Sequence, residues 1–166
     1  MEWFDPSPYV ENSEKLTSIF GYWPSFHDAE IKELRLHVAD GEPWVVGSIA
    51  PVLELQIHVF EMTKDLTQEG YFVLKNHTLA RLRFRNVEDL QLSGFSFQNF
   101  IFELVFGREP MKYPHGGGPI DDTPPEVLTV KIGASVGLSG EFWCQSAEVV
   151  SVEPCDESGR PLAAAS

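Results

Sequence analysis

The stretch FGYWPSFHDAEIKELR, residues 20–35, decides how the chain folds, because a helix ends and the first long strand begins within it. Gly21 can adopt the left-handed conformation that closes a helix, and Pro24 prevents the helix from resuming. The aromatic residues that follow are too apolar for an ordinary loop, so we expect them to close one end of a hydrophobic core. They are Tyr22, Trp23 and Phe26.

Three polar residues come directly after these aromatics: His27, Asp28 and Glu30. In a functional interpretation they form a metal or acid–base site, which needs further convergent partners. In a structural interpretation Asp28 caps local backbone N–H groups and His27 forms a nearby hydrogen bond, as such residues do in turns. A bare His–Asp pair favours the structural interpretation. We therefore expect a structural motif made of Trp23, Phe26, His27, Asp28 and Glu30.

The pattern of apolar residues changes its period at this stretch. Before it, apolar residues recur at helical spacing behind a cap at Asn12 or Ser13, which predicts a short helix ending at Gly21. After it the period is two, with Ile31 out of phase, which indicates a bulge near Lys32. About seven strands follow, so the predicted fold is α+β and mainly β, with a largely antiparallel sheet. The clearest strands are expected at residues 52–60, 78–84, 100–106, 127–134, 142–144 and 147–152.

Composition restricts the class of protein. A chain of 166 residues with 43% hydrophobic residues predicts one globular domain, which we place at residues 1–153, with a loosely ordered tail at 154–166. The formal net charge of −13 argues against binding to nucleic acid or to an anionic membrane. The N-terminus lacks signal-peptide features, and the two cysteines are too few for a disulfide scaffold, so we expect a cytoplasmic protein.

A ladder of arginines occupies alternate positions of one predicted strand. Arg81, Arg83 and Arg85 share one face, because side chains in a strand alternate between the two faces. In an acidic protein such a ladder is best explained by cross-strand pairing, and Glu54 and Glu103 are the expected partners.

The motifs of common enzyme classes are missing from the sequence. It contains no P-loop, dinucleotide glycine fingerprint, nucleophile elbow, HExxH or paired CxxC. His37 and His58 fall on the polar faces of two strands that we expect to pair, but a metal needs three or four convergent donors. We therefore expect no catalytic residues, no metal and no cofactor.

Residues 107–126 are rich in glycine and proline, which predicts a long exposed loop. Apolar and aromatic side chains in it precede an acidic pair, a composition typical of protein-binding patches. The alternative is an insertion without structure. The predicted partner-binding residues are Met111, Tyr113, His115, Asp121 and Asp122.

Four segments resemble the immunity protein 50 family of bacterial polymorphic toxin systems: WPSFHDAEI (23–31), LELQIHVFEMT (53–63), KNHTLARLRF (75–84) and DLQLSGFSFQNFIFEL (89–104). The most specific of these is the FHDAEI run. The resemblance extends from the predicted helix to Val152 and implies a small cytoplasmic protein, not an enzyme, that binds and neutralises a cognate toxin.

The acidic surplus suits a basic toxin, such as a nuclease, because opposite charge accelerates association. Two alternatives stay open at this point. One is a small metal-dependent or acid–base hydrolase centred on the FHDAE segment. The other is a non-enzymatic adaptor domain.

Overall fold

The computed structural model describes residues 4–38, 51–111 and 126–162. It contains one α-helix, one short 3-10 helix and nine strands. In chain order these are η1 (Ser7–Tyr9), β1 (Val10–Glu11), α1 (Glu14–Phe20), β2 (Glu30–Val38), β3 (Pro51–Leu66), β4 (Phe72–Arg85), β5 (Glu88–Ser93), β6 (Phe100–Pro110), β7 (Glu126–Val136), β8 (Ser139–Cys144) and β9 (Ser146–Pro154). No helix within these ranges is long and apolar enough to cross a membrane.

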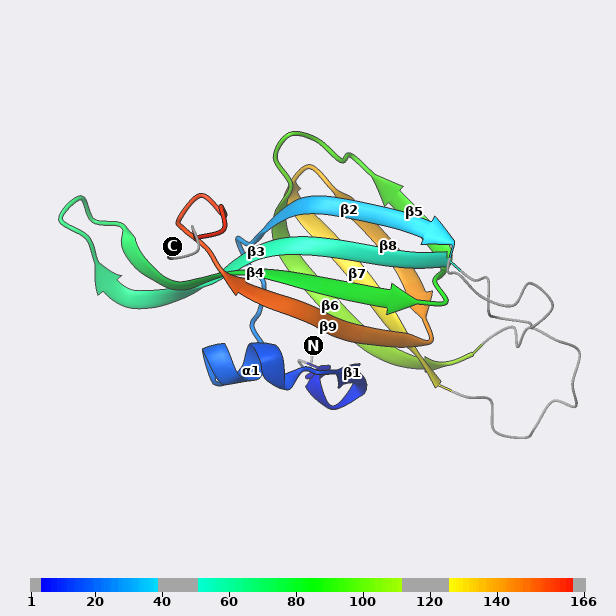
Figure 1. Cartoon of the computed structure of the whole chain (residues 1–166). Coiled ribbons are helices and arrows are strands. Elements are labelled where there is room, and N and C mark those ends of the chain that lie inside the picture. The colour runs from blue at the N-terminus through cyan, green and yellow to red at the C-terminus, as the bar shows by residue number, and fades with distance from the viewer. Residues whose placement is uncertain (1–3, 39–50, 112–125, 163–166) are drawn as a thin grey trace, which may run out of the picture.

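The strands form one sheet that folds over on itself. Their order is β1-β9-β4-β3-β2-β6-β7-β8-β5, and every pairing is antiparallel except that of β1 with β9. Within the described residues β2 pairs with β6 only at Glu30 and Phe100. The sheet divides there into a front layer, β9-β4-β3-β2, and a rear layer, β6-β7-β8-β5 (Figure 1).

The predicted fold class is confirmed, but the strand number is nine rather than about seven. The first additional strand, β1, has only two residues, too few for a visible alternation. The second, β5, follows β4 so closely that its apolar residues Leu90 and Leu92 continue the pattern of the strand before it.

The helix and the first bulge lie where the sequence predicts them. Gly21 takes a left-handed conformation (φ 82°), and its N–H donates to the carbonyl oxygen of Thr17 at 2.7 Å, which ends α1. The register of β2 against β3 shifts between Ile31 and Glu33, so the bulge is confirmed. The helix buries Leu16 and Phe20 at the lower edge of the layers, beside β1 (Figure 1).

The arginine ladder of β4 is paired on both sides. Arg83 Nε donates to Glu54 Oε1 on β3 at 2.7 Å, and Arg85 Nη2 donates to Glu148 Oε2 on β9 at 2.6 Å. The expectation for Glu54 is thus confirmed and that for Glu103 is wrong. Glu103 lies on β6 in the rear layer, opposite Gly133, whereas the neighbours of β4 are β3 and β9.

The residues after β9 pack against the front layer as far as Leu162. Asp156 Oδ1 accepts hydrogen bonds from the N–H groups of Ser158 and Arg160, and these bonds lower the pKa of Asp156. A side-chain carbon at Gly159 would lie 3.0 Å from His58 Nδ1, so the turn fits closely over β3. The sequence places this segment in a loosely ordered tail, and its residues 155–162 form a hydrogen-bonded turn.

Candidate functional site

The aromatic residues of the FHDAEI region lie between the two layers. Trp23 and Phe26 are buried, with ring centroids 5.7 Å apart. The Trp23 ring also meets Phe106 of β6 edge-on at 5.9 Å. These contacts place both side chains in the core. Tyr22 is 55% exposed, so the expectation that it joins them there is wrong.

The polar residues that follow fasten the backbone to β6. The Asp28 N–H donates to the carbonyl oxygen of Ile101 at 2.9 Å, and His27 Nδ1 donates to that of Phe102 at 2.7 Å. Asp28 itself has a left-handed backbone (φ 66°), a conformation that Asp tolerates better than most residues. Among the described groups its carboxylate contacts His27 Nε2 at 3.6 Å and accepts no backbone hydrogen bond, so it does not act as the predicted cap.

The three polar residues of this segment do not converge on one point in the described structure. Glu30 Oε2 pairs with Lys32 Nζ at 2.8 Å instead of joining His27 and Asp28. Residues 4–38, 51–111 and 126–162 contain no group of three or more His, Cys, Asp or Glu side chains that could hold a metal ion.

The histidines on β2 and β3 do not converge. His37 is opposite Val52, six residues before His58 on β3, which corresponds to about 20 Å along a strand. His58 instead contacts His77, with Nε2 and Nδ1 2.9 Å apart, and its ring meets Phe60 edge-on. Burial lowers the pKa of His58, and the neighbouring His77 and Lys32 lower it further.

The predicted partner-binding loop begins and ends on the rear layer. Of its five predicted residues, Met111 is half-buried, and Tyr113, His115, Asp121 and Asp122 lie outside the described residues. The predicted bounds of the loop, residues 107–126, are wrong at both ends, because β6 continues to Pro110 and β7 begins at Glu126, and these two residues face each other. The predicted strand ends at residue 106 because glycine and proline occur in residues 107–110, although a proline is tolerated where a strand ends.

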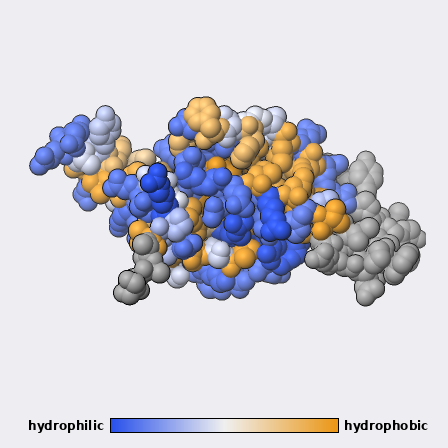
Figure 2. All heavy atoms as spheres, turned by 45° about the horizontal axis from the view of Figure 1, so that its top comes forward, coloured by the Kyte–Doolittle hydropathy of each residue, from blue (hydrophilic) through white to orange (hydrophobic). Residues whose placement is uncertain are grey.

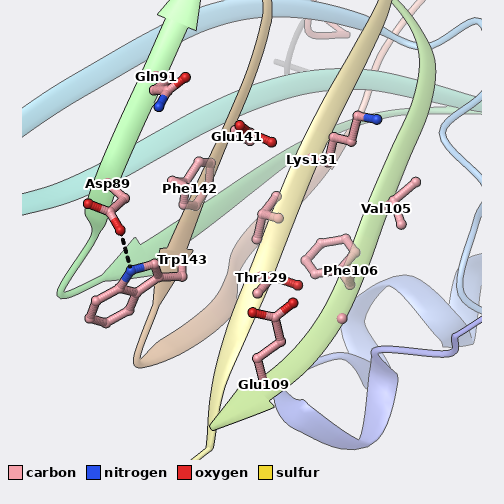
Figure 3. A pocket seen from close by; sticks show the side chains of 12 residues that line it. Asp89, Gln91, Val105, Phe106, Glu109, Thr129, Lys131, Glu141, Phe142 and Trp143 are labelled. Atoms are coloured by element: carbon pink, nitrogen blue, oxygen red, sulfur yellow. Dashed lines mark hydrogen bonds between the residues drawn. The ribbon is translucent and has the colours of Figure 1, made fainter. Parts of the chain in front are cut away.

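The outer face of the rear layer contains a shallow groove of about 670 Å³ (Figure 3). Its sides come from β5, β8, β7 and β6, and two cross-strand rows form its floor. Lys131 is opposite both Val105 and Glu141, and Thr129 is opposite both Gly107 and Trp143. The residues that line it are Asp89, Gln91, Val105, Phe106, Gly107, Glu109, Thr129, Val130, Lys131, Glu141, Phe142 and Trp143.

The lack of a side chain at Gly107 makes the groove deeper. A Cβ there would lie 2.7 Å from Thr129 Oγ1, so any larger residue would fill the space beside Thr129. Trp143 lies at the opposite side, where its Nε1 donates to Asp89 Oδ2 at 3.2 Å (Figure 3). This bond holds the indole at the rim with part of its surface exposed.

The lining of the groove is acidic. Among the described lining residues, Asp89, Glu109 and Glu141 contribute three carboxylates and Lys131 contributes the one ammonium group. All four side chains are exposed. An indole beside carboxylates suits a lysine or arginine of a partner, because the carboxylates attract the cation and the ring face can stack on it. The groove is thus suited to binding a basic protein surface.

Sequence reasoning missed this groove. Apart from the buried Phe106, Val130 and Phe142, its residues are the outward-facing members of four strands, and each strand shows an ordinary alternation of inward and outward residues. A usable signal was present in Trp143, which is an aromatic at an outward position between Phe142 and Cys144. The adjacency of the four strands was needed to connect it with Glu109 and Thr129.

The comparison with protein-family models matches residues 12–155 to a family described as Immunity protein 50. The chain belongs to the immunity protein 50 family. The matched range of this immunity protein 50 member begins just before α1 and ends just after β9, so the whole groove lies inside it. No curated protein and no solved structure matches the chain. Family membership supports an immunity-type function.

Proposed function

We propose that this chain is a cytoplasmic immunity protein that binds a cognate toxin of a polymorphic toxin system and neutralises it by occupying its surface. The observation that carries the proposal is the family match over residues 12–155. Inhibition of this kind requires a rigid scaffold and a complementary surface, and it requires no catalytic residues. The extensive sheet supplies the scaffold.

The acidic groove is the proposed contact surface for the toxin. Its three carboxylates and the chain's formal charge of −13 favour a basic partner, and a nuclease toxin is a natural candidate because its cleft must attract nucleic acid. Trp143 is the residue most suited to an energetic hot spot, since tryptophan is enriched at such positions.

The loop between β6 and β7 is the second part of the proposed surface. It starts beyond Pro110 and returns at Glu126, and Glu109 belongs to the lining of the groove. Met111 directly follows β6, and Tyr113, His115, Asp121 and Asp122 come after it in the sequence and before β7, so both ends of this segment join strands that line the groove. We expect them to extend the contact with apolar anchors and further negative charge.

The test is binding to a toxin domain encoded by a neighbouring gene, sought first immediately upstream, with growth rescue on co-expression. Glu141→Lys should raise the Kd about tenfold, mainly by slowing association, and the effect should shrink at high salt. Trp143→Ala should raise it through faster dissociation. Tyr113→Ala should also weaken binding without lowering the melting temperature.

The matched control is Glu153→Lys, which makes the same change in net charge at an exposed position of β9 in the other layer. Wild-type affinity in this control would assign the effect of Glu141→Lys to the groove. Failure of the wild-type protein to bind or rescue would refute the proposed function. Normal binding by both groove variants would refute the proposed surface.

A further inference from the structure

A two-stranded extension projects from the front layer. β2 begins at Glu30, opposite His58 of β3, and β9 ends at Pro154, opposite Thr78 of β4. Beyond these points, the described strands β3 and β4 pair only with each other (Figure 1). We call residues 61–75 the β3–β4 arm.

One face of the arm is apolar and exposed. Met62 is opposite Leu74, and Leu66 is opposite Phe72, so the two pairs share a face in spite of the register shift between them. Their exposed fractions are 48% for Met62, 38% for Leu74, 61% for Leu66 and 52% for Phe72. The exposed area is on the order of 400 Å², which is within the range of the largest patches on ordinary monomers, and these are often functional.

The other face of the arm carries the apolar Val73 and is otherwise polar and hydrogen-bonded. Thr63 Oγ1 donates to the carbonyl oxygen of Val73 at 2.7 Å, and Asn76 Nδ2 donates to Glu61 Oε2 at 3.1 Å. Glu61 also lies 3.9 Å from Lys75. These contacts hold the arm in an extended shape before any partner is bound, which reduces the entropy lost on docking.

The arm exposes its apolar face at a cost, since a two-stranded hairpin without a covered face is marginally stable in water. Figure 2 shows apolar atoms along the arm between its polar tip and the body of the protein. A surface that covers the face would remove Leu66 and Phe72 from water and would also support the hairpin.

We propose that the β3–β4 arm is a second docking element, whose apolar face packs on an apolar patch of the toxin. This inference rests on the proposed function. Charge decides between the toxin and a second copy of this chain. Two copies would each carry a formal charge of −13 and repel one another, whereas a basic toxin is attracted. The arm carries three acidic and two basic side chains, so its own contribution is apolar.

The test uses the same purified toxin domain and the whole 166-residue chain. The double variant Leu66→Thr, Phe72→Thr keeps good strand formers and removes most of the apolar surface. We expect its Kd to rise at least tenfold, through dissociation more than association. The matched control is Val73→Thr, a substitution of similar shape on the other face, which should stay within twofold of wild type.

Met62→Thr provides a second variant in case the double variant disturbs the hairpin. Met62 is 48% exposed on the same apolar face, opposite Leu74, and its substitution should weaken binding severalfold. Wild-type affinity in both variants would overturn the arm while leaving the proposed function in place. Absence of binding by the wild-type chain would overturn both.

Sedimentation of the protein alone distinguishes the other occupant. A monomer at all concentrations supports the toxin as the partner of the arm. A dimer that Leu66→Thr, Phe72→Thr dissociates, with toxin affinity unchanged, would identify a second copy as the occupant and overturn the proposal.

Discussion

Glu54→Gln is the substitution that should most clearly lower the stability of the folded framework, because it changes a buried ion pair and leaves the proposed binding surfaces unaltered. The Glu54 residue is 3% exposed, and its two oxygens accept hydrogen bonds from Arg83 Nε at 2.7 Å and Arg81 Nη1 at 3.4 Å. Burial alone would raise the pKa of Glu54. The hydrogen bond from Arg83 and the charges of Arg83, Arg81 and Arg35 outweigh it, so the pKa is lowered.

The expected loss of stability is about 2–3 kcal/mol. A hydrogen bond to a charged group contributes about 1.5–3 kcal/mol, and breaking a fully buried ion pair costs about 3–5 kcal/mol. Here the bond from Arg81 is long, and the Arg83 side chain is 31% exposed, so water can replace part of the lost interaction. The glutamine amide would also direct N–H groups at a guanidinium.

Urea unfolding at pH 7 measures this loss, provided that the m-value is unchanged. The control is Glu33→Gln, because Glu33 pairs with the same Arg81 at 3.3 Å but has a side chain that is 50% exposed. An exposed pair of this kind contributes less than about 1 kcal/mol. Equal losses in the two variants would refute the assignment of Glu54 as the buried centre of the network.

The pH dependence of Glu54 gives a second measurement on the same variants. Its folded pKa lies below the unfolded value, so its contribution is complete above the unfolded pKa, near 4.5, and is lost as pH falls through the folded pKa. The wild-type protein should therefore lose more stability below pH 4.5 than Glu54→Gln does. Parallel curves for the two proteins would contradict this expectation.

Two further predictions concern the backbone at Asp28 and the buried His58. Because Asp28 has φ 66°, Asp28→Ala should lower the unfolding free energy by about 1 kcal/mol, whereas Asp28→Gly should stay within about 0.5 kcal/mol of wild type. Equal losses in thermal or urea unfolding would show that the carboxylate matters more than the backbone. Burial lowers the pKa of His58 from 6.5, so the unfolded chain binds the proton more readily, and stability should fall as pH drops below 6.5 towards the folded pKa. His58→Gln should flatten this part of the curve, and an unchanged slope would contradict the prediction.

Local features of the sequence were enough for the helix end, the bulge and the fold class. A glycine that can take positive φ, followed by a proline, stops a helix whatever lies around it, as at Gly21 and Pro24. The displacement of Ile31 from the alternation of β2 likewise follows from counting residues, and the register shift lies there. The strong period of two in β3 and β4 can also be counted along the sequence, and it predicted the antiparallel framework.

The partners of each strand were beyond the reach of these local features. Glu103 and Glu148 have the same chemistry and similar alternation, and only the order β9-β4-β3 decides that Glu148 meets Arg85. The groove depends on the same kind of information, because Glu109, Thr129 and Trp143 come from three strands whose adjacency is set by long-range pairing. The sequence by itself determined the helix, most of the strands and which side of each strand faces inward. The tertiary structure decided which outward faces combine into a surface, because strand pairing depends on how all the apolar faces are buried together.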